Sequence, residues 1–103
     1  MKWSGLVARI LIVEDEPQVL TLAASVLQPA GYEVISAATL SEAEAVIDDT
    51  ARKFDLLFIE IELGYEKEGG IALGKLIEEP RPGIPVLYTS GRAEKLENNS
   101  APR

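Results

Sequence analysis

Short apolar runs alternate with amphipathic stretches along this 103-residue chain. The apolar runs have the length and the β-branched and aromatic content of strands that are buried on both faces. The stretches between them carry apolar residues at helical spacing. An alternation of strand and helix is typical of an α/β domain with a parallel sheet. The predicted strands cover about residues 8–13, 32–36, 56–61 and 84–89.

Turn and capping residues set the limits of the predicted helices. A proline suits the first turn of a helix over residues 17–27, and a Pro-Ala-Gly sequence ends it. Ser41 with Glu44 three residues later forms a capping box, which predicts a helix over about 41–51. A third helix is predicted over about 71–79, where two prolines stop it. Phe58 and Tyr88 are predicted to be core aromatics of their strands.

Two of the apolar runs end in acidic residues. The first runs into Glu14, Asp15 and Glu16, and the third runs into Glu60. Parallel strands carry functional groups just past their carboxyl ends, so three or four carboxylates would converge on one pocket if these strands are neighbours. Because carboxylates that lie together repel, such a cluster needs a cation or shares protons. Glu16 is interpreted as a helix-start residue rather than as a ligand.

The composition narrows the chemistry of this pocket. The chain has 17 acidic and 10 basic residues and a net charge of −7, which argues against binding to nucleic acid. It contains neither cysteine nor histidine, so oxygen ligands remain, and these suit magnesium, calcium or manganese. No segment reaches membrane-spanning length. We therefore expect a cytoplasmic protein with no membrane partner.

Three motifs stand out along the chain, namely Ile10–Pro17, Phe54–Leu63 and Ile84–Gly91. Their order and spacing resemble the receiver domain of two-component response regulators. The resemblance covers about residues 8–92. It implies a single flavodoxin-like (CheY-like) α/β domain over residues 1–103, with strand order 2-1-3-4-5 and its site between strands one and three.

The resemblance implies a role for each of five residues. Glu14 and Asp15 match the acidic pair of the family, and Asp15 would be a direct metal ligand. Glu60 falls on the phosphoacceptor position, and Ser90 falls on the hydroxyl position after strand four. The implied magnesium ligands are Asp15, Glu60, the backbone carbonyl of Glu62, and Glu14. Such an ion would offset the charge of a phosphoryl group that moves onto a carboxylate.

Two departures from the family pattern predict a degenerate receiver. The acceptor position holds Glu60 rather than aspartate, and one extra methylene moves the carboxylate by ~1.5 Å, an error that near-attack geometry tolerates badly. The same substitution is expected to weaken the implied magnesium site. The family's lysine after strand five has no counterpart, because Lys95 lies only five residues after Ser90. Strand five and the last helix are therefore expected to be missing, with residues 93–103 as a poorly ordered polar tail.

These features predict a signalling module that acts through protein contacts and is not an enzyme. The expected partner is a histidine kinase or another signalling protein. An open edge at strand four would invite a second copy, or a partner that completes the sheet.

Two alternatives belong to other functional classes. One is a receiver that still accepts a phosphoryl group on Glu60 from a histidine kinase. The other is a small magnesium-dependent phosphoryl-transfer enzyme, which would need a cleft and a general base in a chain without histidine. The sequence from Gly69 to Leu76 matches part of a phosphate-binding P-loop. However, Leu76 stands where serine or threonine is required, so this segment is interpreted as a helix.

Overall fold

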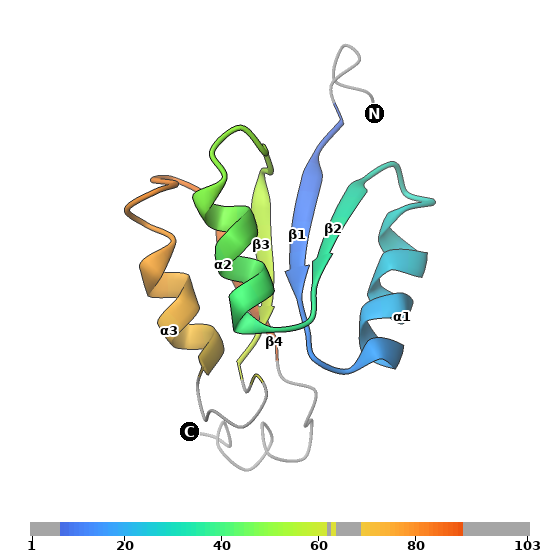
Figure 1. Cartoon of the computed structure of the whole chain (residues 1–103). Coiled ribbons are helices and arrows are strands. Elements are labelled where there is room, and N and C mark those ends of the chain that lie inside the picture. Colours follow the sequence, from blue (N-terminus) through green and yellow to red (C-terminus); the bar gives the residue numbers. More distant parts are fainter. Residues whose placement is uncertain (1–6, 62, 64–68, 90–103) are drawn as a thin grey trace, which may run out of the picture.

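The computed structural model describes residues 7–61, 63 and 69–89 (Figure 1). Strands and helices alternate along this part of the chain, which confirms the predicted α/β class. The elements are β1 (Arg9–Val13), α1 (Pro17–Leu27), β2 (Glu33–Ala37), α2 (Leu40–Asp48), β3 (Leu56–Glu60), α3 (Gly69–Leu76) and β4 (Val86–Thr89).

The four strands form one parallel sheet in the order β2-β1-β3-β4. This is the order predicted for these strands. The chain moves outward from β1 to β2 and then crosses to the other side of β1 to form β3, so the order reverses between β1 and β3. Loops that leave the strand ends at such a reversal diverge and leave room for a site. The predicted loss of strand five and the polar tail concern residues 90–103, which lie outside the described residues.

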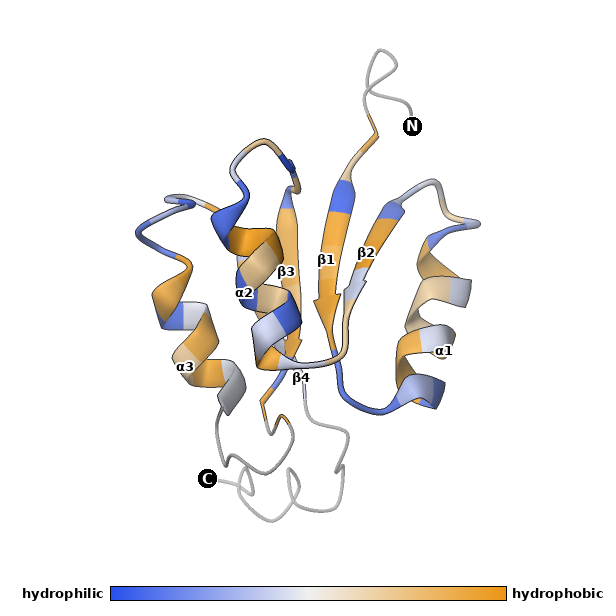
Figure 2. Ribbon diagram, viewed as in Figure 1, coloured by the Kyte–Doolittle hydropathy of each residue, from blue (hydrophilic) through white to orange (hydrophobic). Residues whose placement is uncertain are grey.

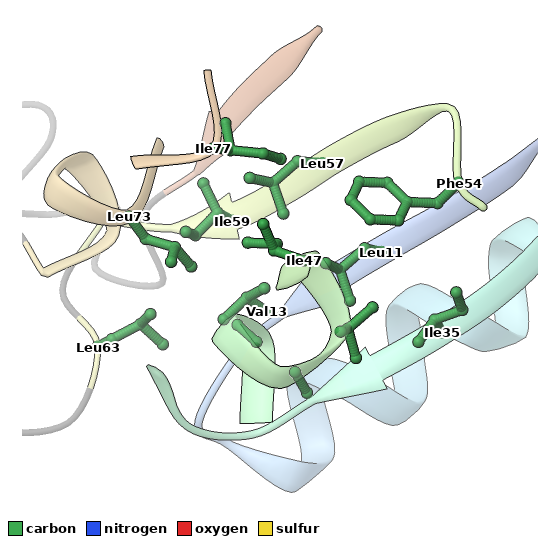
Figure 3. Packing of buried hydrophobic residues seen from close by; sticks show 13 residues of the cluster. Leu11, Val13, Ile35, Ile47, Phe54, Leu57, Ile59, Leu63, Leu73 and Ile77 are labelled. Atoms are coloured by element: carbon green, nitrogen blue, oxygen red, sulfur yellow. The ribbon is translucent and has the colours of Figure 1, made fainter. Parts of the chain in front are cut away.

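The hydrophobic core lies between one face of the sheet and helices α2 and α3 (Figures 1 and 3). Alternate side chains of a strand point to opposite faces, and the core side chains of β1 and β3 follow this period of two. They meet the buried side chains of both helices in one cluster. Its largest fully buried members are Leu11, Val13, Leu57, Ile59, Leu63, Leu73 and Ile77.

The opposite face of the sheet is less completely covered. Ile12 and Phe58 are in register on this face, and α1 lies against it. No residue of α1 is fully buried, and Phe58 is only half-buried. Tyr88 is 41% exposed, so its predicted place in the core is wrong. The reason is its position on β4, which is one of the two outer strands in the described part of the sheet.

The predicted capping box at the start of α2 is wrong by two residues. Thr39 has extended backbone angles and is the N-cap, and its hydroxyl accepts a hydrogen bond from the N–H of Glu42 at 3.1 Å. The carboxylate of Glu42 accepts one from the N–H of Ala38 at 2.7 Å. Ser41 and Glu44 already lie inside the helix. Thr39 and Glu42 therefore provide acceptors for backbone N–H groups at the start of α2, two residues before the predicted pair.

The carboxyl end of α2 is closed by a buried arginine from a distant loop. The guanidinium of Arg81 donates hydrogen bonds to the carbonyls of Ile47 at 3.0 Å, Val46 at 3.0 Å and Asp49 at 2.8 Å. It also lies over the ring of Phe54, 4.5 Å from its centre. The arginine therefore adds donors to the carbonyls at the end of α2, of which those of Val46 and Asp49 also accept from the backbone N–H groups of Asp49 and Arg52.

Candidate functional site

The first part of the site is Glu14, the residue that follows β1. Its backbone N–H donates to the carbonyl of Ala37 at 3.0 Å, which fastens it to the end of β2. Its carboxylate accepts a hydrogen bond from the backbone N–H of Glu16 at 3.1 Å. The residue is only 4% exposed, so this local hydrogen bond holds a carboxylate in the interior.

The second part is Glu60, the last residue of β3, which is also 4% exposed. It is in register with Thr89 at the end of β4, and the N–H of Ile61 donates to the carbonyl of Thr89 at 2.8 Å. The carboxyl ends of β1, β3 and β4 therefore bring Glu14, Glu60 and Thr89 to one edge of the sheet.

The folded protein disfavours ionisation of the Glu14 carboxyl group. Burial and repulsion from the charges of Glu60 and Asp15 raise its pKa to about 7, although the hydrogen bond from Glu16 opposes the shift. Since Glu60 contributes to this shift, the two buried acids interact electrostatically. We call Glu14, Asp15 and Glu60 the acidic pocket.

The acids that follow β1 and end β3 differ in their exposure. Glu14 and Glu60 are buried, whereas Asp15 and Glu16 are exposed. Glu16 is the N-cap of α1, in agreement with its interpretation as a helix-start residue. A cation beside the two buried acids would relieve the repulsion between them.

The acidic pocket offers carboxylate oxygens, which are the hard ligands that magnesium prefers. The described residues contain no group of three or more acids that could hold a metal ion by themselves. Water molecules, or residues outside the described part of the chain, would have to complete the coordination of an ion. The predicted carbonyl ligand of Glu62 and the predicted hydroxyl of Ser90 both lie outside the described residues.

Sequence reasoning missed Thr89. With Glu14 it lines a cavity of about 60 Å³ under α1, whose other walls are apolar. The available signal was strand register, because Thr89 directly follows the apolar residues of β4 and pairs with Glu60. The other residues that line the cavity are Ile12, Val13, Val19, Ala23 and Phe58.

Helix α3 packs directly on the end of β3 that carries Glu60. The N–H of Gly70 donates to the carbonyl of Ile61 at 2.8 Å. A Cβ atom at residue 70 would overlap the carbonyl oxygen of Glu60. Only glycine permits this approach, so the first turn of α3 packs directly against the backbone of Glu60, a residue of the acidic pocket.

Residues 10–101 match the family model of the response regulator receiver domain. The chain belongs to this family. The sheet order and the acidic residues after β1 and β3 agree with the resemblance derived from the sequence. The chain is therefore a receiver domain of two-component signalling with a flavodoxin-like fold.

Two regulatory proteins are similar to this receiver in sequence. The chain is 37% identical over 83 residues to the nitrogen assimilation regulatory protein NtrX of Azorhizobium caulinodans, covering 80% of the chain and 18% of NtrX. It is 34% identical over 88 residues to the phosphate regulon transcriptional regulatory protein PhoB of Pseudomonas aeruginosa, covering 84% of the chain and 37% of PhoB. In both comparisons the chain spans well under half of the relative's length.

A solved receiver structure is similar in fold. The CheY-like response regulator receiver domain protein from Methanospirillum hungatei superposes with a TM-score of 0.73 at 29% identity, over 92% of this chain and 76% of that protein. Receiver domains are in general signalling modules rather than enzymes, and they interact with kinases and other signalling proteins. No helix in the described part of this receiver is long and apolar enough to cross a membrane.

Proposed function

We propose that this receiver is degenerate and acts through protein contacts, without ordinary phosphorylation of Glu60. One observation carries the proposal. The residue that ends β3 inside the acidic pocket, at the position where the resemblance expects the phosphoacceptor aspartate, is a buried glutamate.

The length of glutamate is what opposes phosphorylation. The extra methylene displaces the carboxylate by ~1.5 Å, and misplacement of a reacting group by about 1 Å costs on the order of 100-fold in rate. The pocket has little freedom to correct this, because Gly70 packs on the Glu60 carbonyl and Thr89 is paired beside it. The glutamate also carries negative charge toward the place that a phosphoryl group would occupy.

Receiver domains typically bind Mg²⁺, and we extend this to the present chain as part of the proposal. Asp15, Glu60, Glu14 and the carbonyl of Glu62 would hold the ion, which would offset the repulsion between the buried acids. A thermal-unfolding titration with MgCl₂ tests this, with CaCl₂ and Asp15→Asn for comparison. Magnesium should raise the Tm of the wild type, and Asp15→Asn should lose most of this rise.

The proposed partner is a histidine kinase or another signalling protein in the cytoplasm. β4 is one of the two outer strands of the described sheet, and an outer strand offers unpaired backbone groups to another chain. A second copy or a partner that completes this side of the sheet is therefore part of the proposal. No catalytic turnover is assigned to the acidic pocket.

Intact-mass spectrometry tests the central proposal. The wild type, Glu60→Asp and Glu60→Gln are incubated with Mg²⁺ and acetyl phosphate, a small phosphodonor from which a carboxylate oxygen takes the phosphoryl group as acetate leaves. We expect a phosphoryl mass gain for Glu60→Asp alone. Glu60→Gln is the matched control, because it has the length of glutamate and lacks the nucleophilic carboxylate.

The outcomes separate the candidate functions. A mass gain in the wild type that Glu60→Gln abolishes would overturn the proposal in favour of a receiver that accepts phosphate on Glu60. A gain in Glu60→Asp alone shows that the rest of the site is competent and that glutamate is the obstacle. If no variant gains mass, the defect extends beyond Glu60.

A further inference from the structure

Helix α1 is the least firmly packed helix in the described part of the chain. None of its residues is fully buried, whereas three residues of α2 and four of α3 are. Leu22 and Val26 are 64% and 63% exposed. In Figure 2 the turns of α1 beyond the first are mainly orange or pale. The helix therefore exposes to solvent apolar side chains of the kind that fasten a helix to a core.

The side of α1 that faces the sheet is also incompletely packed. Val19 and Ala23 of α1 line the cavity of about 60 Å³ together with Ile12 and Phe58 of the sheet. Side chains that line a void lose dispersion contacts on one side. The contact between helix and sheet is therefore weakened at the position where it should be strongest.

No polar side chain compensates for this loose packing. No acidic or basic residue occurs from Pro17 to Tyr32, so α1 forms no ion pair with another element. In the described part of the chain its side chains make one hydrogen bond, which is local and runs from the hydroxyl of Ser25 to the carbonyl of Leu22. The end of α2, in contrast, is held by the guanidinium of Arg81. Helix α1 is thus held to the sheet by apolar contacts alone.

The attachment points of α1 to the sheet lie just outside the helix. Before it, the N–H of Glu14 donates to the carbonyl of Ala37 at 3.0 Å, and after it, the N–H of Glu33 donates to the carbonyl of Ala8 at 3.0 Å. Between these two points, Gly31 has a φ of +104° and open space at its Cβ position. Such a glycine tolerates a change of backbone angle that other residues resist. The segment over residues 16–31 is therefore bounded by positions that can act as hinges.

We propose that residues 16–31 form a hinged lid on the sheet, which opens as one unit while the rest of the fold stays intact. Segments with few buried contacts open locally at a lower free energy than the whole domain unfolds. Opening uncovers the apolar side chains of Ile12 and Phe58 under α1. The inference rests on the proposed function in one respect, namely that the acidic pocket is the site that is regulated.

One hydrogen bond links this lid to the acidic pocket. The carboxylate of Glu14 accepts the N–H of Glu16, which is the N-cap of α1, at 3.1 Å. Since Glu14 stays with the sheet and Glu16 moves with the helix, opening breaks this bond. A change in the pocket that alters the Glu14 carboxylate therefore alters the opening of α1, and the effect is reciprocal.

Native-state amide hydrogen exchange, followed by NMR in low concentrations of urea, measures the opening. Amides over residues 21–27 in α1 should exchange at least about tenfold faster than amides over 43–48 in α2. Their exchange should also depend less on urea, because opening the lid exposes less surface than unfolding the domain. Equal exchange in the two helices, or an equally steep dependence on urea, overturns the proposal.

Two identical substitutions in α1 test the role of the cavity. Val19→Ala removes a side chain that lines the cavity, and Val26→Ala removes one that is 63% exposed. Both increase helix propensity by a similar amount, so their difference reports packing. Val19→Ala should speed exchange throughout α1 about fivefold relative to Val26→Ala and leave α2 unchanged. An equal rise in α2 means that the helices unfold together, and no rise in α1 means that the cavity wall does not hold the lid. Either result contradicts the proposal.

The amide of Glu16 tests the link to the acidic pocket. Val19→Ala should speed its exchange by the same factor as in α1, because its bond to Glu14 breaks in the same event. The amide of Ala38 is the matched control, since it donates to the carboxylate of Glu42 at the start of α2 and should not change. A Glu16 amide that does not respond, or an equal response at Ala38, contradicts a lid that begins at the pocket.

These outcomes are separable from phosphorylation at Glu60, because the exchange measurements use neither phosphodonor nor magnesium. A lid that opens with Glu16 can coexist with a wild type that takes up a phosphoryl group, in which case the degenerate function fails and the lid stands. Conversely, an unmodified protein in which α1 and α2 exchange together overturns the lid alone.

Discussion

Gly70 lies directly against the backbone carbonyl of Glu60. The N–H of Gly70 donates to the neighbouring carbonyl of Ile61 at 2.8 Å, and there is no space for a Cβ atom between residue 70 and the Glu60 carbonyl oxygen. The contact joins the start of α3 to the end of β3. It therefore couples the packing of a helix to the position of the acid at the centre of the site.

Gly70→Ala should be strongly destabilising, because its Cβ meets backbone atoms that cannot rotate away. Overpacking of this kind costs about 1–3 kcal/mol, and a backbone obstacle places this variant at the upper end. Urea denaturation measures the change in the free energy of unfolding. A loss below about 0.5 kcal/mol would mean that α3 can slide away from β3 without cost.

Gly74 provides the matched comparison within the same helix. A Cβ at residue 74 would overlap the hydroxyl of Tyr88, a side chain that is 41% exposed and has room to move. Gly74→Ala should therefore destabilise the fold less than Gly70→Ala. Tyr88→Phe should reduce the cost of Gly74→Ala, and a double-mutant cycle measures the coupling, which we expect to exceed about 0.5 kcal/mol. Additive effects would contradict the contact.

Glu14→Gln should stabilise the protein at alkaline pH. The folded-state pKa of Glu14 is raised from 4.5 to about 7, so the folded protein binds more protons than the unfolded chain between these values. The raised pKa of Glu14 therefore leaves the free energy of unfolding of the wild type unchanged below about pH 4.5. It lowers this free energy as the pH rises from there to about 7, and the loss persists at higher pH. The full effect is at most roughly 3 kcal/mol.

The measurement is the difference in unfolding free energy between Glu14→Gln and the wild type at about pH 5 and about pH 8. The gain should be larger at the higher pH. Glu44→Gln is the control, because Glu44 is exposed on α2 and the same substitution there removes a charge without removing buried repulsion. An equal gain at both pH values would contradict the burial of an ionisable Glu14.

The sequence predicts the parts of the fold that depend on periodicity. Buried strands with acids at their ends are visible in the apolar runs, and their order follows from the resemblance to receivers. Tyr88 could not be assigned in this way, because its exposure depends on which strand is outermost. Arg81 was missed for a related reason. Its partners are carbonyls more than 30 residues away in sequence, and no local pattern reveals them.

The acidic pocket was predictable in its residue types and not in its energetics. Glu14 and Glu60 follow from the position of acids after strands. The sequence does not show that Glu14 is buried while the neighbouring Asp15 is exposed, because this difference depends on the turn into α1. Thr89 was missed because two hydroxyl residues stand in a row at the end of the fourth apolar run, and only the strand register shows that Thr89, the last residue of β4, pairs with Glu60.

Thr39→Ala should destabilise α2 more than Ser41→Ala does. The Thr39 hydroxyl accepts the N–H of Glu42 at 3.1 Å, whereas Ser41 is an exposed residue inside the helix. Loss of an N-cap side chain costs about 1 kcal/mol, and replacement of serine by alanine at an exposed helical site is favourable by a few tenths. Chemical denaturation of both variants measures the difference. The reverse order would restore the capping box first inferred from the sequence.

Arg81→Leu should be among the most damaging single substitutions in the described part of the chain. It removes three hydrogen bonds to the carbonyls that end α2. The carbonyls of Val46 and Asp49 still accept from the backbone N–H groups of Asp49 and Arg52, so the largest penalty falls on the carbonyl of the buried Ile47. Since a buried polar group without a partner costs about 1–3 kcal/mol, a loss of about 2–3 kcal/mol is expected. Arg81→Lys should recover little, because an ammonium group lacks the planar fork that reaches several carbonyls at once. Arg52→Leu is the control, since Arg52 is exposed. If Arg81→Lys unfolds at the wild-type urea concentration, a positive charge alone stabilises the end of α2 and the planar shape of the guanidinium is not required.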